Sequence, residues 1–315
     1  LRRRRSAKFW PMIAAIRETP GRRLKASIRI SANDRLDSQN LDLKVASGFG
    51  REWSTFRQDA DHLSQQQRQK IFDDYFRIFP WHLLPPGGGV GIDVGCGTGR
   101  WAMLVAPRVR HLHLLDASAD ALAVAKQNLT ISSNVSFHAN SVAEIPLPSQ
   151  SLDFGYSLGV LHHVPDTQAA IDAVADKLKP GAPFLVYLYY AFDNRPAWYR
   201  GLWRATNLAR LMISRLPHVL RLAVSQAIAV LVYWPLARVA RLASELGRPT
   251  KSLPLSYYAD KSLYVMRTDA YDRFSTRLEK RFTRAEIERM LQSAGFENVR
   301  FSDREPFWCA VAIKK

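Results

Sequence analysis

An alternation of strand-like and helix-like segments, which begins at residue 90, restricts the fold of this chain more than any other feature. Short apolar runs of the kind that form buried strands alternate with segments of helical periodicity. Strands that alternate with helices form βαβ units, in which the strands are parallel and helices cover both faces of the sheet. The predicted strands are 90–94, 111–115, 135–139, 152–158 and 184–190, followed after a long gap by 299–302 and 308–313.

The helices between these strands carry end signals of their own. Ser118 precedes a segment with apolar residues along one face, so we expect it to be an N-cap. Thr283 and Glu286 have the spacing of a capping box, and Gly295 stands where the helix that they begin should end. The whole pattern predicts an α/β fold with a doubly wound, mostly parallel, seven-stranded sheet.

Segments of different composition divide the chain into five parts. Residues 1–40 are a basic arm that we expect to be disordered, and residues 41–87 are an aromatic helical cap. Residues 88–193 hold the first five strands and form the core. Residues 194–270 interrupt the rhythm with helical sequence rich in arginine, and residues 271–315 return to it. We therefore expect one α/β domain with an N-terminal helical cap and a helical insertion after the fifth strand.

Positive charge is concentrated in two parts of the chain. The formal net charge is +17 at pH 7. Residues 1–30 hold ten Lys and Arg against Glu18, and residues 194–251 hold ten against Glu245, so the rest of the chain is close to neutral. Such clusters indicate an anionic partner, and membrane headgroups, phosphates and RNA all remain open.

The cysteines and the apolar runs indicate in which cellular compartment the protein is expected and whether it contacts a membrane. Cys96 and Cys309 are too few for a disulfide framework or a four-cysteine zinc site, so a reducing, cytoplasmic setting is expected. The longest uncharged run, residues 222–237, has sixteen residues, whereas a membrane-spanning helix needs about 20. The insertion is then either a helical lid that packs on the domain or an amphipathic layer in peripheral contact with an anionic membrane.

The most informative local motif is a glycine-rich loop directly after the first strand. Gly95, Gly97 and Gly99 stand at alternate positions, and a helical segment follows. Without Cβ atoms, such a loop lets a ligand lie against the backbone, near the free N–H groups of a helix N-terminus. Dinucleotide binders place a small residue where this chain has Arg100. The loop therefore favours a nucleotide-like cofactor that is not a dinucleotide.

Two carboxylates at neighbouring strand ends narrow the choice of cofactor. Asp93 lies two residues before the first glycine, where a carboxylate suits a cationic amine better than a pyrophosphate. Asp116 closes the second strand, where a carboxylate can accept both hydroxyls of a ribose. S-adenosylmethionine carries an amine, a ribose and an adenine but no phosphate, so it is the expected cofactor.

Five separated segments resemble one known family, in order. Motif I of the class I S-adenosylmethionine-dependent methyltransferases, specifically their type 11 branch, is similar to residues 93–101, which read D-V-G-C-G-T-G-R-W. Residues 140–147 resemble the loop of that family that contacts adenine, and residues 157–166 resemble its segment with two histidines after the fourth strand. Residues 178–182 and 282–301 are similar to a later turn and to a late helix and strand.

The resemblance implies a Rossmann-like methyltransferase that moves a methyl group from S-adenosylmethionine to a small-molecule or lipid-like acceptor by in-line displacement. Asn140 departs from the family, which usually has Asp there to accept from the adenine amino group, although an amide oxygen can also accept. The cofactor-binding residues that the resemblance implies are Asp93, Gly95, Cys96, Gly97, Gly99, Asp116, Ala117, Asn140, Ser141, Val142 and Leu158.

A hydroxyl acceptor would also need a base within hydrogen-bond reach. His163 at the mouth of the fourth strand is the first candidate, and Tyr189 or Tyr190 beyond the fifth strand comes next. Enzymes that methylate nucleic-acid amines often carry a D/N-P-P-Y/F-like tetrapeptide where residues 157–160 read S-L-G-V, so a nucleic acid is not the expected acceptor. No metal site is expected. The alternative is a non-enzymatic protein that binds S-adenosylmethionine or RNA on the same fold.

Overall fold

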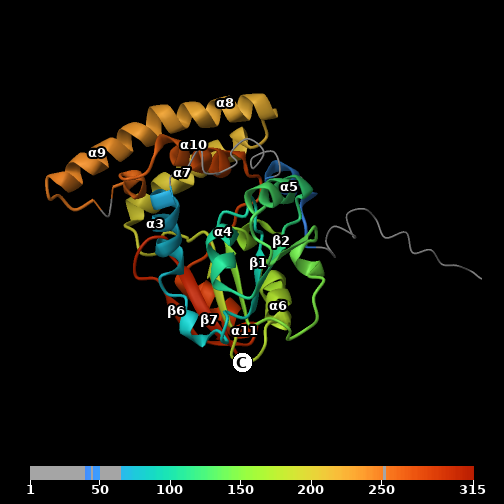
Figure 1. Ribbon diagram of the computed structural model, residues 1–315. Helices are drawn as coiled ribbons and strands as arrows, with labels where there is room; N and C mark the ends of the chain where they lie inside the picture. The colour runs from blue at the N-terminus through green and yellow to red at the C-terminus, as the bar shows by residue number, and fades with distance from the viewer. Residues whose placement is uncertain (1–39, 44, 50–64, 251–252) are drawn as a thin grey trace, which may run out of the picture.

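The computed structural model describes residues 40–43, 45–49, 65–250 and 253–315, and a seven-stranded sheet forms its centre (Figure 1). The strand order is β3-β2-β1-β4-β5-β7-β6. Strand β7 is antiparallel to both of its neighbours, and the other pairs are parallel. The predicted α/β fold is thereby confirmed. Its strands are β1 (Val90–Val94), β2 (His111–Leu115), β3 (Val135–His138), β4 (Phe154–Leu158), β5 (Pro183–Tyr187), β6 (Phe296–Phe301) and β7 (Cys309–Lys314).

Helices cover both faces of this sheet. One face carries α6 (Thr167–Lys177) and α11 (Arg284–Ser293), and each face has its own cluster of buried side chains. Burial of a Phe or Leu side chain stabilises the fold by about 1.5–3 kcal/mol, so these two layers hold the sheet together. The other face carries α3 (Gln65–Phe76), α4 (Ala102–Val105) and α5 (Ala119–Asn128).

The helix ends follow the sequence signals. The Ser118 side chain accepts from the backbone N–H of Ala121 and caps α5, as predicted. Thr283 and Glu286 form the predicted capping box at the start of α11. These caps satisfy backbone donors that a helix N-terminus otherwise leaves free.

Strands β4 and β5 differ from the prediction at their ends. Strand β4 begins at Phe154 rather than at residue 152, because Leu152 makes an isolated bridge outside the strand. Strand β5 ends at Tyr187 rather than at residue 190, because its pairing with β7 stops there. The chain then leaves the sheet, and this departure turns Tyr189 toward the cavity described below.

The N-terminal parts of the chain are described only in part. Residues 45–49 and α3 are helical, and residues 50–64 of the expected helical cap lie outside the described residues. The predicted basic arm also lies outside them, except for Asn40. This residue is buried, its side-chain amide donates to the backbone carbonyl of Asp166 at 2.6 Å, and its Oδ1 accepts from the Asp166 N–H at 2.7 Å.

The insertion forms a helical layer over the carboxyl ends of the parallel strands (Figure 1). Helices α8 and α9 are joined without a break through a π-helical turn, and Figure 1 shows them as one long, bent helix across the top of the molecule. Pro235 follows this turn, and π turns and proline are common causes of helix bending. The expected boundary at residue 270 falls within α10. The elements are α7 (Ala197–Ile213), α8 (His218–Ile228), η5 (Ala229–Tyr233), α9 (Trp234–Glu245) and α10 (Leu263–Ser275).

Candidate active site

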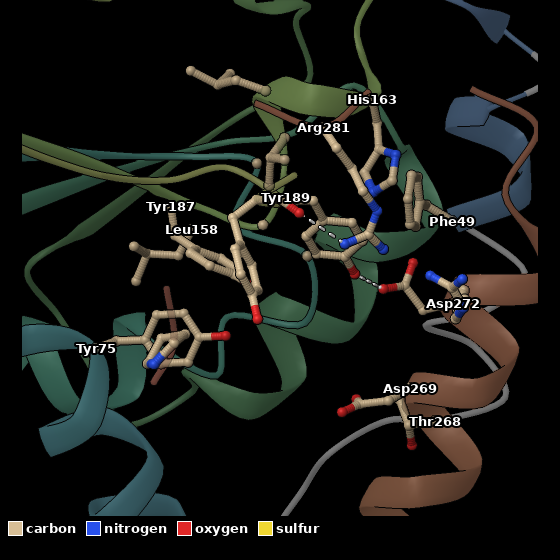
Figure 2. A pocket seen from close by; sticks show the side chains of 18 of the residues that line it. Phe49, Tyr75, Leu158, His163, Tyr187, Tyr189, Thr268, Asp269, Asp272 and Arg281 are labelled. Carbon is tan, nitrogen blue, oxygen red and sulfur yellow. Dashed lines mark hydrogen bonds between the residues drawn. The ribbon is translucent and has the colours of Figure 1, made fainter. Parts of the chain in front are cut away.

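A cavity of about 580 Å³ lies between the core and the insertion, at the carboxyl ends of the parallel strands (Figure 2). The core contributes the loop after β1 and the ends of β2, β4 and β5. Residues of α7, η5 and α10 form the opposite wall. Open α/β sheets bind their ligands at this edge, so the cavity is the candidate active site.

The glycine loop after β1 exposes bare backbone to this cavity. Gly95 and Gly97 line it, with φ angles of +78° and +53° that favour glycine. A Cβ atom on Gly95 would lie 2.4 Å from a methyl group of Val160, so no larger residue fits there without a shift. Gly99 does not line the cavity. A Cβ atom there would lie 2.9 Å from a methyl group of Leu129, so Gly99 allows the loop to pack close to α5.

Asp116 lies in the cavity wall with its carboxylate held in place. Its Oδ2 accepts from the backbone N–H of Gly97 at 2.9 Å, and its Oδ1 accepts from that of Ser118 at 2.8 Å. Burial raises the pKa of this carboxyl, and the two N–H donors oppose that effect. Each oxygen keeps a second lone pair. The carboxylate can therefore accept ribose hydroxyls, as the sequence predicts.

The predicted adenine-contacting residues form the next part of the wall. Asn140, Ser141 and Val142 all line the cavity, as do Ala117 and Leu158. The Oγ of Ser141 is buried and has no hydrogen-bond partner among the described residues. A buried hydroxyl without a partner is costly, so this atom points to a ligand that would satisfy it.

The thiol of Cys96 also lines the cavity but is not suited to be a nucleophile. Burial raises its pKa well above the ordinary value, and nearby Asp116 and Asp93 add to that effect. The reactive form of cysteine is the thiolate, which this environment disfavours. Cys96 thus acts as a small residue of the loop, as its sequence context predicts.

Asp93, which the sequence analysis expected to contact the amine of the cofactor, lies behind the cavity wall. It is 1% exposed and does not line the cavity. Its Oδ2 accepts from the Tyr156 hydroxyl at 3.0 Å, and burial raises the pKa of its carboxyl to about 8. The reason lies in strand geometry: successive residues of β1 point to opposite faces, and Asp93 points to the side where the Tyr156 ring lies. The structure gives Asp93 a supporting position behind the loop.

These residues fit S-adenosylmethionine on three structural observations. The loop at Gly95 and Gly97 offers bare backbone, Asp116 offers free carboxylate lone pairs, and Ser141 offers an unpartnered buried hydroxyl. None of these features is specific for phosphate, whereas together they match the ribose and base of an adenosyl group.

His163 reaches the cavity from the turn after β4 and is 4% exposed. Its Nδ1 lies 2.7 Å from the backbone carbonyl of Leu278. A carbonyl can only accept, so Nδ1 carries the proton and neutral His163 keeps a lone pair on Nε2. Burial lowers the pKa of the imidazole, which favours the neutral form, and Nε2 has no partner among the described residues. This is the protonation state that a base requires.

His162 has a different role from its neighbour. It is fully buried and does not line the cavity, and its ring stacks on that of Tyr189 with 3.8 Å between the centroids. Its Nδ1 accepts from the backbone N–H of Tyr189 at 3.3 Å. His162 is therefore a support for Tyr189, in line with the expectation that one of the two histidines packs.

Tyr189 is a hydrogen-bond donor in this structure. Its hydroxyl donates to Oδ2 of Asp272, as the dashed line in Figure 2 shows. Burial raises the pKa of this phenol well above its ordinary value, and the charge of Asp272 adds to the effect. A phenol that holds its proton so firmly is a poor base at neutral pH, so the geometry favours His163 over Tyr189 as a base.

Helix α10 supplies functional residues that the sequence analysis did not identify. Asp269 and Asp272 both line the cavity; in Figure 2 they lie on the side opposite Tyr75 and Tyr187, with Asp272 beside Tyr189. Burial raises the pKa of Asp269 to about 6, and this residue accepts from the Tyr258 hydroxyl at 3.0 Å. No motif marks these carboxylates. Their place becomes evident only when α10 packs over the strand ends.

The half of the cavity away from the glycine loop is aromatic, and Arg281 lies among its rings. The Cζ of Arg281 lies 5.0 Å from the ring centroid of Tyr189, 4.9 Å from Phe192 and 5.2 Å from Trp203. Its Nε donates to Glu279 at 2.8 Å. Cation–π contacts of this kind hold a guanidinium in a defined place. The other aromatic residues that line the cavity are Phe49, Tyr75, Trp101, Tyr187, Tyr190, Tyr199, Tyr233, Tyr257, Tyr258, Phe274 and Phe307.

Comparison with known proteins agrees with this geometry. A family model described as "Methyltransferase domain" matches residues 92–181, which include the glycine loop, Asp116 and His163. An uncharacterized methyltransferase of Mycobacterium tuberculosis is 28% identical over 125 residues, which are 40% of this chain and 61% of that protein. The demethylmenaquinone methyltransferase of Bacillus licheniformis is 26% identical over 147 residues, 45% of this chain and 61% of that protein.

The chain thus spans less than two thirds of the length of these relatives. Among solved structures, the N-methyltransferase NodS from Bradyrhizobium japonicum in complex with S-adenosyl-L-homocysteine is 18% identical, with a TM-score of 0.39 over 51% of this chain and 78% of that one. This likeness is too distant to support an argument. The type 11 branch stays a prediction. The family model and the curated relatives, together with the cavity, support a class I S-adenosylmethionine-dependent methyltransferase domain in the part of the chain that contains residues 92–181.

Proposed function

We propose that this protein transfers a methyl group from S-adenosylmethionine to a largely apolar small molecule or lipid-like acceptor. One observation carries the proposal: the glycine loop with Asp116 and the aromatic chamber under the insertion line the same cavity. A methyl donor held at the loop would therefore share an enclosed space with an apolar acceptor, as direct transfer requires.

Different residues of the cavity would have different roles in such a reaction. When bound, the cofactor supplies an electrophilic methyl group, so the protein has to align the acceptor and exclude water. Gly95, Gly97, Asp116 and Ser141 would hold the adenosyl part. The aromatic side chains around Arg281 would hold the acceptor and keep water out. His163, with its lone pair on Nε2, would take the proton from an acceptor hydroxyl.

The names of two relatives are consistent with an apolar acceptor. One relative is a demethylmenaquinone methyltransferase, and another, 29% identical over 108 residues, is the ubiquinone biosynthesis O-methyltransferase of Xylella fastidiosa. Both names point to quinone chemistry in those proteins. We extend from them only the class of acceptor, which is an apolar molecule. A cytoplasmic location, expected from two cysteines that are both free and buried, forms part of the same proposal.

Methyl transfer can be tested directly. The full chain would be incubated with S-adenosylmethionine that carries an isotopically labelled methyl group and with a fractionated cell extract. We expect the label in the lipid or apolar small-molecule fraction, and we expect its loss with Asp116→Ala. Label confined to RNA or protein would contradict the acceptor class. Cofactor binding with no labelled product in any fraction would favour the alternative of a non-enzymatic binding protein.

A further inference from the structure

The outer side of the long insertion helix is an apolar surface that no described part of the chain covers. From Val219 to Leu236, all the exposed residues are apolar. We call them the outer face. Single exposed apolar residues are common, whereas a continuous apolar face on one helix marks an interaction site. Its members are Val219, Leu220, Ala223, Ala227, Val230, Leu231, Val232, Trp234, Pro235 and Leu236.

The inner side of the same helix packs on the protein. Ala229, Tyr233 and Ala237 are buried against Met266 and Phe274 of α10. The outer face is thus the unpartnered side of a helix that is already docked. Figure 1 shows this helix at the edge of the molecule farthest from the sheet.

The outer face is continuous with the cavity. Val232 and Leu236 belong to the outer face, at 43% and 40% exposed, and both also line the cavity. Leu202 of α7, which is not part of the outer face, is 45% exposed and also lines the cavity. Val232 and Leu236 therefore connect the outer face with the aromatic half of the cavity.

Basic side chains accompany the outer face. Arg215 precedes the outer face in the sequence, Arg241 and Arg248 follow it, and Arg204 is on α7; all four are exposed. Glu245, the one acidic residue from 195 to 250, accepts from Arg241 at 2.9 Å. Apolar side chains next to exposed arginines match the interface of an anionic bilayer, where the apolar groups enter the acyl boundary and the cations meet the headgroups. This charge complementarity favours an anionic lipid surface over an apolar protein partner.

The packing of the helix favours a position along the bilayer rather than through it. The unbroken helix His218–Glu245 is long and apolar enough to span a membrane by length and composition alone. Arg221, however, faces inward and donates to the backbone carbonyls of Ser214 and Ser275, at 3.4 and 3.5 Å. A spanning helix would have to take this arginine away from its partners and into hydrocarbon, which is costly.

We propose that the outer face docks on an anionic membrane and that the apolar acceptor enters the cavity from the bilayer. The docking step goes beyond the proposed function and would hold even if the cavity bound another ligand. The entry step rests on the proposed function.

Vesicle flotation tests the docking step. The full chain would be floated with vesicles of phosphatidylcholine alone and with vesicles that contain one quarter phosphatidylglycerol. We expect binding to the anionic vesicles that weakens as salt is raised, because headgroup attraction is screened. In Leu220→Glu/Leu231→Glu, whose two residues do not line the cavity, the bound fraction should fall on the order of tenfold. Ile131→Glu changes a residue that is 96% exposed on the core and should bind as the wild type does.

Three measurements separate this inference from its rivals. The double variant should keep the melting temperature of the wild type and its affinity for S-adenosylhomocysteine. If both fall, the variant is misfolded. The test is then repeated with Val219→Glu/Leu220→Glu, at the end of the helix. A wild-type dimer that the double variant dissociates, without vesicle binding, would identify the outer face as a contact between two copies and overturn the proposal. Equal binding to both kinds of vesicle would also overturn it, because the arginines would then have no role.

Discussion

The hydroxyl of Tyr189 donates a hydrogen bond to the carboxylate of Asp272, 83 positions later in the chain. Tyr189 follows β5 and Asp272 lies on α10, so this bond joins the core to the insertion across the cavity. His162 stacks beneath Tyr189 and fixes its ring. The position of the insertion over the strand ends therefore depends on a polar contact as well as on apolar packing.

Removal of this contact should loosen the insertion. In Tyr189→Phe the carboxylate of Asp272 loses its donor, and hydrogen bonds to charged groups contribute about 1.5–3 kcal/mol. We expect the free energy of unfolding in urea to fall by that amount. In a double-mutant cycle with Asp272→Asn, the two changes should not be additive. Tyr199→Phe changes a cavity tyrosine that takes no part in this bond, and it is the control. Additive effects would show that the two groups do not stabilise each other.

His163 should be the residue on which turnover depends most. His163→Ala removes the lone pair on Nε2, and general-base groups contribute about 10²–10⁴-fold to rate. His162→Gln changes a histidine that does not line the cavity. It should lower the melting temperature and leave kcat close to that of the wild type. Steady-state kinetics with the identified acceptor measure both. If His163→Ala kept wild-type turnover, His163 would not be the base.

The pH profile offers a second test of His163. Burial lowers the pKa of its imidazole below the ordinary value of 6.5. A base must be deprotonated to accept a proton. We therefore expect kcat to be constant from neutral pH down to pH 6.5 and to decline only below pH 6.5. A decline centred above pH 7 would point to a different group.

The sequence predicted the strands, the glycine loop and Asp116 because each depends on local patterns. The strand pattern predicts that the loop after β1 lies at the carboxyl edge of the sheet. Asp116 is the residue after the end of β2, so it is predicted at the same edge. The sequence pattern does not reveal that Asp93 lies behind the loop, in contact with Tyr156 of the neighbouring strand, and its predicted contact with the cofactor stays a prediction. Asp269 and Asp272 could not be predicted, because the way in which α10 packs depends on tertiary contacts far along the chain.

The buried carboxyl of Asp93 should make stability depend on pH. Its pKa is raised from 3.8 to about 8 in the folded protein, so the folded state binds this proton more tightly than the unfolded state. The resulting stabilisation is complete below about pH 4 and is lost as the pH rises through about 8.

The variant Asp93→Asn keeps an acceptor for Tyr156 but cannot ionise. Its melting temperature, relative to the wild type, should therefore rise between pH 5 and pH 9 by roughly 2 °C or more. Asp303→Asn, at an exposed position, should show a constant difference. A constant difference for Asp93→Asn as well would mean that Asp93 does not titrate in this range.

A side chain at Gly95 should damage the loop. In Gly95→Ala the new Cβ atom would lie 2.4 Å from Val160 at a φ of +78°, and such overpacking costs about 1–3 kcal/mol. We expect a lower melting temperature and weaker cofactor binding. Gly181→Ala has a similar φ of +83° with no neighbour within 4 Å, so it measures the backbone strain alone. Gly95→Ala/Val160→Ala should recover part of the loss, and no recovery would exclude the clash as its cause.

Calorimetric titration of the full chain with S-adenosylhomocysteine, NAD and ATP tests most directly whether the cavity is built for an adenosyl group without phosphate. We predict uptake of one S-adenosylhomocysteine per chain, none of NAD or ATP, and a loss of affinity on the order of tenfold or more in Asp116→Ala, whose ribose acceptors are gone. Uptake of NAD or ATP without uptake of S-adenosylhomocysteine would contradict the account.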